Sequence, residues 1–331
     1  MSLPKTLLLL AALAIVAVLG LGWHMLERAV PMPDGAVRVS VPKGANVRTV
    51  AARLREQGIE VSPQLLVLRY RMRGLDGQLK AGTYEFAAPQ TIDTLLDKIA
   101  LGDTVVASVR FIEGWTFRQM RAAIDAHPEL ASDSAGLSDA EIMKRIGAER
   151  DQPEGLFMPD TYTFSPGISD LDIYRQAHRA LERQLTETWQ RRSADLPLTS
   201  PYEALILASI IEKETGRPED RARVAGVFVN RLRIGMMLQS DPTTIYGLGE
   251  RFDGNLRRSD LRADTPYNTY TRKGLPPTPI ALVSAASLEA AVNPAETKAL
   301  YFVARGDGSS QFSNTLAEHN RAVARFQLGR K

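Results

Sequence analysis

Residues 204–216 read ALILASIIEKETG, an apolar run that ends in two carboxylates, Glu212 and Glu214, before a glycine. A run that is apolar on every side predicts a helix buried in a core. Because successive residues of a helix turn by about 100°, the two glutamates should point to opposite sides. A buried carboxylate without a partner costs free energy, so one of the two is expected to have a function.

The apolar stripes that precede the two glutamates differ in size. At three, four and seven positions before Glu214 lie Ile211, Ile210 and Leu207, and before Glu212 lie Ser209, Ala208 and Leu205. Glu214 is therefore expected on the bulkier face, where desolvation favours the protonated carboxyl. A carboxyl that stays protonated near neutral pH can act as a general acid. The alternative is that both glutamates are solvated residues at a helix end.

The composition is that of an ordinary folded protein, and it excludes several chemistries. The 331 residues are 44% hydrophobic, and 41 basic and 38 acidic residues are interleaved, so the net charge of +3 predicts no nucleic-acid partner. The absence of cysteine excludes disulfides and thiolate chemistry. The four histidines are scattered, and no phosphate-cradling, dinucleotide-binding or serine-elbow pattern occurs. Neither a metal nor a cofactor is predicted.

The first thirty residues contain a charge-free run from Thr6 to Trp23, preceded by Lys5. The run is long enough to span a bilayer, so residues 1–30 are expected to be a cytoplasmic stub and a transmembrane anchor. A cleavable signal peptide is the alternative, but the run is longer than a usual signal core and no A-x-A site follows it. Residues 31–36 are a short polar linker.

Residues 37–107 predict a small α+β module. Strands are expected at 37–41, 81–86 and 105–112, and helices at 47–57, 63–73 and 92–101. Asn46 and Thr91 are suitable N-caps for the first and last of these helices. The module carries no catalytic pattern and is expected to bind a ligand or to act as a spacer.

Residues 108–331 predict a mainly helical domain, so the fold class is α+β. Helices are expected at 114–126, 139–146, 171–192, 204–214, 218–235 and 315–328, and a hairpin at 300–313. The aromatic segment Gly155–Phe164 fits neither helical nor strand periodicity. It is expected to line a core wall or a cleft.

Carboxylate chemistry surrounded by polar and aromatic loops remains, and it suits a sugar polymer. Ordinary glycosidases use two carboxylates, about 5 Å apart in retaining and about 6.5–9.5 Å apart in inverting enzymes. Glu212 should face away from Glu214 and pair instead with a basic side chain. Asp241 is a candidate second carboxylate, although in a Ser-Asp-Pro turn it is also a typical cap. Without a second carboxylate the sugar must supply its own nucleophile.

Several motifs together resemble the YceG-like family of endolytic murein transglycosylases. They are Glu212-Lys-Glu-Thr215, Asn230-Arg-Leu-Arg-Ile-Gly235, Leu238-Gln-Ser-Asp-Pro-Thr243, Ile245-Tyr-Gly247, Tyr267-Asn-Thr-Tyr270, Tyr301-Phe-Val303 and Glu318-His-Asn320. Each motif alone is weak, but their order and spacing are specific. The resemblance covers nearly all of the chain.

The resemblance implies a fold and a location. It implies an N-terminal transmembrane helix, a LysM-like module over 37–107, and a lysozyme-like catalytic domain over 108–331 with a small β-hairpin. It further implies a single-pass protein of the bacterial inner membrane whose catalytic domain lies in the periplasm. The implied partners are peptidoglycan glycan strands and penicillin-binding glycan synthases.

The resemblance also implies the reaction. Glu214 corresponds to the catalytic glutamate of the family, which cleaves the bond from N-acetylmuramic acid to N-acetylglucosamine without water and leaves a 1,6-anhydro end. The residues implied to bind substrate are Gln239, Asp241, Tyr246, Tyr267, Asn268 and Tyr270. Two alternatives remain open: a hydrolytic muramidase that uses Glu214 with Asp241, and a non-catalytic peptidoglycan-binding scaffold for the synthases.

Overall fold

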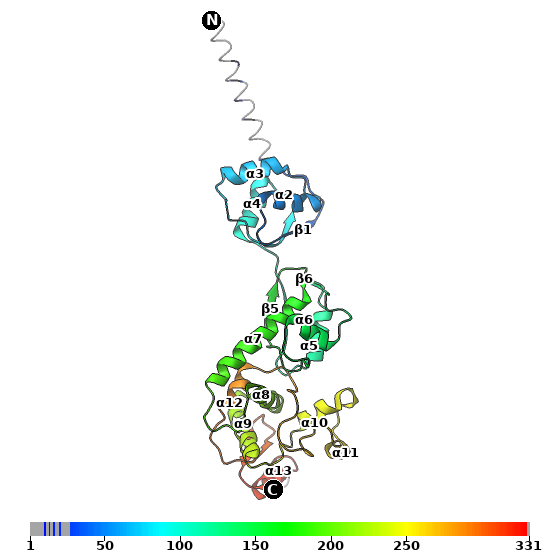
Figure 1. Ribbon diagram of the computed structural model, residues 1–331, viewed down its shortest axis with the longest axis vertical. Coiled ribbons are helices and arrows are strands. Elements are labelled where there is room, and N and C mark those ends of the chain that lie inside the picture. Colours follow the sequence, from blue (N-terminus) through cyan, green and yellow to red (C-terminus); the bar gives the residue numbers. More distant parts are fainter. Residues whose placement is uncertain (1–9, 11–12, 14–15, 17–19, 21–26, 330–331) are drawn as a thin grey trace. The chain divides into compact units, whose positions relative to one another are not determined.

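The computed structural model describes residues 10, 13, 16, 20 and 27–329 (Figure 1). These residues form two compact units. The first unit comprises the described residues up to Ala107 together with 163–167, and the second comprises 108–162 and the described residues from 168 onward. Helices dominate both units, and the strands are few and short.

The expected transmembrane helix is not supported. A span needs about 20 consecutive apolar residues in a helix. Among residues 10, 13, 16, 20 and 27–329, no helix is both long enough and apolar enough to cross a membrane. Most of the run from Thr6 to Trp23 lies outside the described residues. The predicted fold class is therefore corrected to two units of mixed helices and short strands.

The first unit packs three helices on a two-stranded antiparallel sheet. Its elements are β1 (Ala36–Val41), α2 (Val47–Glu56), α3 (Pro63–Met72), β2 (Gly82–Ala87) and α4 (Ile92–Leu101). In the sheet, Val39 lies opposite Tyr84, and both side chains are buried. Asn46 caps α2 by accepting a hydrogen bond from the Thr49 N–H at 2.9 Å, as its position in the sequence predicts.

The first part of the second unit surrounds an aromatic core. Its elements are β3 (Ala107–Arg110, whose first residue belongs to the first unit), α5 (Phe117–Asp125), β4 (Leu130–Ala131), α6 (Asp139–Ile146), β5 (Thr161–Phe164, whose last two residues belong to the first unit), β6 (Ile168–Ser169) and α7 (Asp170–Gln190). Phe157, from the aromatic motif, lies 5.3 Å from the ring of Phe117 and 5.8 Å from that of Tyr174. This part of the motif is a core wall.

The remaining elements of the second unit begin with α8. They are α8 (Pro201–Glu214), α9 (Pro218–Arg233), α10 (Asp241–Leu248), the 3-10 turn η1 (Gly249–Arg251), α11 (Arg258–Arg262), α12 (Ala285–Val292), β7 (Tyr301–Ala304), β8 (Ser310–Ser313) and α13 (Leu316–Phe326). Strands β7 and β8 form an antiparallel hairpin where one was expected. Helices α7, α9, α10 and α12 all contact α8 (Figure 1).

Helix α8 is the centre of the second unit's core. Every residue from Ala204 to Ile211 is buried, so both stripes compared in the sequence are covered by neighbouring helices. The helix begins with Pro201 after Ser200, whose side chain accepts a hydrogen bond from the Glu203 N–H. It ends at Glu214, where the chain turns extended at Thr215. The buried helix thus places its last side chain at the edge of the core.

Candidate active site

Glu214 is the last residue of α8, and its carboxyl has one direct hydrogen-bond donor. The hydroxyl of Ser240 donates to Oε1 of Glu214 at 2.6 Å. Burial raises the pKa of Glu214 from its ordinary 4.5 to about 7, against the opposing effects of the Ser240 bond and the charge of Arg231. The negative charge of Asp241 raises this pKa further. A carboxyl with these properties can donate and accept a proton near neutral pH.

The loop before α10 fixes the position of Ser240. Gln239 has φ of 48°, the one positive φ among the described non-glycine residues. This conformation is sparsely populated and needs support from its surroundings. Thr269 supplies that support: its carbonyl accepts the Gln239 N–H at 3.1 Å, and its hydroxyl accepts the Ser240 N–H at 3.0 Å. The strained turn thereby directs the Ser240 hydroxyl toward Glu214.

Asp241 and Tyr270 form a second polar pair close to Glu214. The Tyr270 hydroxyl donates to Oδ1 of Asp241 at 2.5 Å. Burial raises the pKa of Tyr270 above its usual value, so the phenol stays a donor at neutral pH. Asp241 is the first residue of α10, whose N-cap position is occupied by Ser240. The Asp241 carboxylate is exposed and is oriented by Tyr270.

Arg231 on α9 joins the loop before Ser240 to the segment that leads into β7. It is 6% exposed, and its guanidinium donates to the carbonyls of Leu300 at 2.7 Å and Leu238 at 2.6 Å. It also lies 5.3 Å from the ring centroid of Tyr301, which stacks on His319. We did not predict Arg231 as a site residue, although it belongs to the Asn230–Gly235 motif. Its positive charge favours the ionised form of Glu214.

Asn268, predicted to bind substrate, uses its side chain inside the protein. Its exposed fraction is 1%, and its amide donates to the carbonyls of three residues: Asp260, Leu261 and Ala263. Its oxygen accepts hydrogen bonds from the Tyr270 N–H and the Thr244 hydroxyl. Asn268 therefore holds the loop that presents Tyr270, and a direct contact with substrate stays a prediction.

Tyr246, near the end of α10, lies beside Tyr267, which follows α11 in the chain. Their rings meet edge to face, with centroids 4.9 Å apart. The Tyr246 hydroxyl donates to Glu154 at 3.2 Å, and the Tyr267 hydroxyl bonds the Thr278 hydroxyl at 2.8 Å. Glu154 is a buried carboxyl that sequence reasoning missed. Its sequence signal is its place directly before the Gly155–Phe164 motif.

Burial raises the pKa of Glu154 from 4.5 to about 7. Hydrogen bonds from the N–H of Phe117, from Tyr246 and from the N–H of Gly155 oppose this rise. The Phe117 N–H contacts both carboxyl oxygens, at 3.0 and 3.2 Å. The second unit therefore contains two glutamates whose pKa burial raises to about 7, one bonded at each end of α10.

Glu212 points away from Glu214 but pairs with no basic side chain among the described residues, so that prediction was wrong. Its Oε2 accepts hydrogen bonds from the Ser284 N–H at 2.9 Å and the Ser284 hydroxyl at 2.5 Å. Ser284 is the N-cap of α12, where the helix dipole favours a negative charge. The adjacent basic residue, Lys213, donates instead to the Gly114 carbonyl. Glu212 is thus a structural link between α8 and α12.

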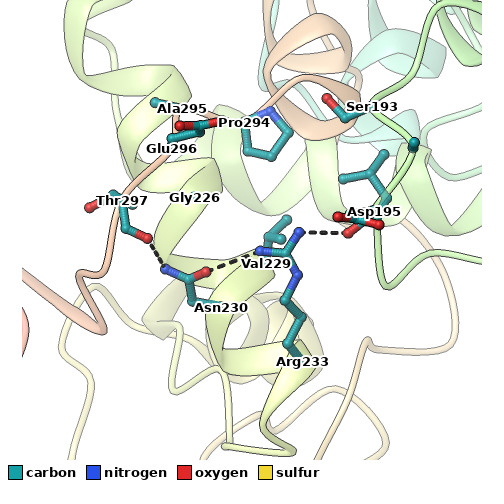
Figure 2. A pocket seen from close by; sticks show the side chains of 12 residues that line it. Ser193, Asp195, Gly226, Val229, Asn230, Arg233, Pro294, Ala295, Glu296 and Thr297 are labelled. Carbon is teal, nitrogen blue, oxygen red and sulfur yellow. Dashed lines mark hydrogen bonds between the residues drawn. The ribbon is translucent and has the colours of Figure 1, made fainter.

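A cavity of about 660 Å³ along α9 contains neither Glu214 nor its contacts (Figure 2). Arg233 donates to the Asp195 carbonyl at 2.6 Å, and Asn230 to the Thr297 carbonyl at 2.8 Å. The polar groups of this cavity therefore join α9 to two loops. Across residues 10, 13, 16, 20 and 27–329, no group of three or more His, Cys, Asp or Glu side chains could hold a metal ion.

The chain is similar to several known proteins. Residues 39–325 match the model of the YceG-like family. The chain is 30% identical over 322 residues to the endolytic murein transglycosylase of Bacillus subtilis, covering 92% of this chain and 89% of that protein. It is 27% identical to the endolytic murein transglycosylase of Streptococcus pneumoniae, covering 91% of this chain and 61% of that protein.

A solved structure is also similar. The crystal structure of a YceG-like protein from Listeria monocytogenes matches with a TM-score of 0.54 and 30% sequence identity, covering 86% of this chain and 98% of that one. The match of the family model extends over both units and includes Glu214, Ser240 and Glu154. The chain belongs to the YceG-like family.

Proposed function

We propose that the protein is an endolytic lytic transglycosylase of peptidoglycan. It cleaves the bond between N-acetylmuramic acid and N-acetylglucosamine within a glycan strand and leaves a 1,6-anhydro end, which terminates the strand. Family membership and the names of the relatives support the activity. The observation that carries the chemistry is the single hydrogen-bonded, partly buried carboxyl of Glu214, whose pKa of about 7 suits both acid and base.

In the first step Glu214 acts as the acid. Ser240 donates to Oε1, so the proton resides on Oε2, which is free to face the glycosidic oxygen. The glycosidic bond breaks, the proton passes to the oxygen of the leaving N-acetylglucosamine, and positive charge develops at C1 of the muramic acid. The N-acetyl carbonyl of that sugar stabilises this charge. Glu214 is left as a carboxylate, which the Ser240 bond and the charge of Arg231 favour.

In the second step Glu214 acts as the base. The C6 hydroxyl of the same muramic acid attacks C1, a C6–O–C1 bond forms, and the hydroxyl proton returns to Glu214. No water is consumed, so no second carboxylate is needed. The two steps make opposite demands on the pKa of Glu214, because a stronger acid leaves a weaker conjugate base. A pKa of about 7 is compatible with both steps.

A hydrolytic muramidase is the competing chemistry. It needs a second carboxylate to activate water or to stabilise the sugar cation. Asp241 is the nearby candidate, and its Oδ1 accepts the Tyr270 hydroxyl. We propose instead that the Asp241–Tyr270 pair orients the sugar beside Glu214. The end group of the product distinguishes the two reactions.

The place of action follows from the substrate. Peptidoglycan lies outside the cytoplasmic membrane, so the catalytic unit is proposed to work in the periplasm, at the outer face of the bacterial inner membrane. Protease added to cells with a permeabilised outer membrane should then degrade the catalytic unit. Degradation only after lysis of the inner membrane would contradict this location.

Two further assignments rest on the same function. The first unit is proposed to be a LysM-like module that binds glycan, and penicillin-binding glycan synthases are proposed to supply the nascent strand. Adding the protein to a purified synthase should shorten the labelled strands that the synthase makes. Strands of unchanged length would contradict the partnership.

Substitution of the two glutamates of α8 tests the assignment of Glu214. Glu214→Gln keeps an acceptor for Ser240 but cannot transfer a proton, so cleavage of glycan strands is expected to fall by roughly 10²–10⁴-fold. Glu212→Gln, the matched control from the same helix, should cleave at nearly the wild-type rate once its folding is verified by circular dichroism. The opposite pattern would overturn the assignment.

A further inference from the structure

A second cavity of the catalytic unit, of about 550 Å³, lies at the far end of α10 from Ser240. Its walls come from the start of α5, the segment before Gly155, the end of α10, and Tyr267. The lining side chains used below are Gln119, Gln152, Glu154, Tyr246 and Tyr267. Its volume falls within the range of about 300–1,000 Å³ that is usual for small-molecule sites.

The polar floor of this cavity is rigid. Glu154 is 8% exposed, and its carboxyl is bound from two directions, by the Phe117 N–H of α5 and by the Tyr246 hydroxyl of α10. These bonds fix the Tyr246 ring, which meets Tyr267 edge to face. Burying the charge of a carboxylate costs free energy. A contact that only packed the core would therefore not need the Glu154 carboxyl beside an open cavity.

The lining combines aromatic and amide side chains with the charged side chains of Arg118 and Asp139. The rings of Tyr246 and Tyr267 offer apolar surface to the C–H faces of a sugar. Gln152 is exposed at the rim, where an amide can bond hydroxyl or N-acetyl groups. The cavity therefore offers ring faces and amide groups that suit a sugar.

Two short segments of the chain connect the cavity lining to the residues around Glu214. Asp241 begins α10 next to Ser240, and Tyr246 lies five residues later, about 7.5 Å along the helix axis. Tyr267 lies three residues before Tyr270, whose hydroxyl bonds Asp241. A strand bound at Glu214 that follows α10 reaches this cavity within a short run of sugars.

We infer that the cavity formed by Glu154, Tyr246, Tyr267, Gln119 and Gln152 is a saccharide subsite, which holds a sugar of the same strand away from the bond that is cut. The inference rests on the proposed function and adds a reason for internal cleavage. A strand must extend beyond the cut bond to occupy the subsite, so long strands are preferred to short ones.

The test uses peptide-free glycan strands and substitutes a residue at the rim of the proposed subsite. Gln152→Trp places a large ring at the rim of the cavity, and Gln190→Trp, at the exposed end of α7, is the matched control. Gln152→Trp should raise KM for long strands about tenfold, the equivalent of about 1.4 kcal/mol, with a smaller change in kcat. For the shortest saccharide that the wild type cleaves, Gln152→Trp and Gln190→Trp should give the same KM.

The outcomes separate the subsite from the function. If the wild type cleaves strands and Gln152→Trp matches Gln190→Trp at every strand length, the subsite is wrong while the proposed function stands. If the wild type cleaves nothing, the proposed function itself fails. Tyr246→Phe, which removes only the hydroxyl that bonds Glu154, provides a second variant and should also raise KM for long strands. Unaltered length dependence in both variants would overturn the inference.

Discussion

The hydroxyl of Ser240 donates to Oε1 of Glu214 at 2.6 Å, from a loop 26 residues farther along the chain. This bond assigns different tasks to the two carboxyl oxygens, because Oε1 is engaged and Oε2 remains for the proton. It also favours the ionised form and so opposes the rise in pKa that burial causes. The balance between these effects sets the pH at which Glu214 can serve as acid and then as base.

Removal of the Ser240 hydroxyl should shift the pH dependence upward. A hydrogen bond to a charged group contributes about 1.5–3 kcal/mol, and one pKa unit corresponds to about 1.4 kcal/mol, so Ser240→Ala should raise the pKa of Glu214 by about one to two units. The alkaline limb of the kcat/KM profile, where Glu214 loses its proton, should move to higher pH by that amount.

Ser209→Ala is the control for this variant. Ser209 is also buried on the same unit and accepts a hydrogen bond from the Ile280 N–H, but it does not contact Glu214. Loss of the Ser209 hydroxyl should lower the free energy of unfolding and leave the alkaline limb of the kcat/KM profile at the same pH. If Ser240→Ala and Ser209→Ala give the same pH profile, Ser240 does not tune Glu214.

Glu214 is expected to lower the stability of the fold at neutral and alkaline pH. Its pKa is about 7 in the folded protein and about 4.5 when unfolded. Below pH 4.5 both states are protonated and nothing is lost. Between pH 4.5 and 7 the unfolded state ionises first, so the free energy of unfolding falls as pH rises, and above pH 7 the loss is complete.

Glu214→Gln removes this titration. The variant should gain about 1–3 kcal/mol of stability relative to the wild type between pH 4.5 and pH 8, after allowance for the partial exposure of the side chain. Urea denaturation at the two pH values measures the difference. A stability difference that is equal at pH 4.5 and pH 8 would show that the carboxyl is not held protonated.

Gly226 in α9 should not tolerate a side chain. A Cβ at this position would lie 2.6 Å from the carbonyl oxygen of Ala295, which is backbone and cannot easily move. Gly226→Ala is expected to destabilise the protein by about 1–3 kcal/mol through overpacking. Gly216→Ala, where a Cβ meets nothing within 4 Å, is the matched control, and equal melting temperatures for the two would contradict the close approach.

Much of the chain's local structure could be predicted from its sequence. The N-cap at Asn46, the buried run of α8 and the β7–β8 hairpin depend on neighbouring residues, and each was found where expected. Asp241 was expected in a Ser-Asp-Pro turn and is the first residue of α10, a helix of eight residues that includes Gly247 and two threonines and packs on α8. Tertiary contacts outweighed local propensity there.

The site was only partly predictable, because its decisive contacts join distant residues. The comparison of stripes selected Glu214, yet Leu205, Ala208 and Ser209 are as buried as the bulkier set. The two glutamates differ in their partners, since Glu212 meets Ser284, which is 72 residues away.

Glu154 shows the same limit. It becomes notable only when Phe117, 37 residues earlier, and Tyr246, 92 residues later, are placed beside it. No local pattern in the sequence brings these three residues together. A single sequence therefore identifies the acid, Glu214, more readily than the residues that orient it.

The end group of the product tests the central claim most directly. Purified peptidoglycan is treated with the protein, and the released glycan fragments are analysed by mass spectrometry, with Glu214→Gln as the blank. If Glu214 acts as acid and then base with the C6 hydroxyl as nucleophile, the new ends are 1,6-anhydro-muramic acid, lighter by one water than a reducing end. Reducing muramic acid ends that incorporate oxygen from labelled water would contradict the account.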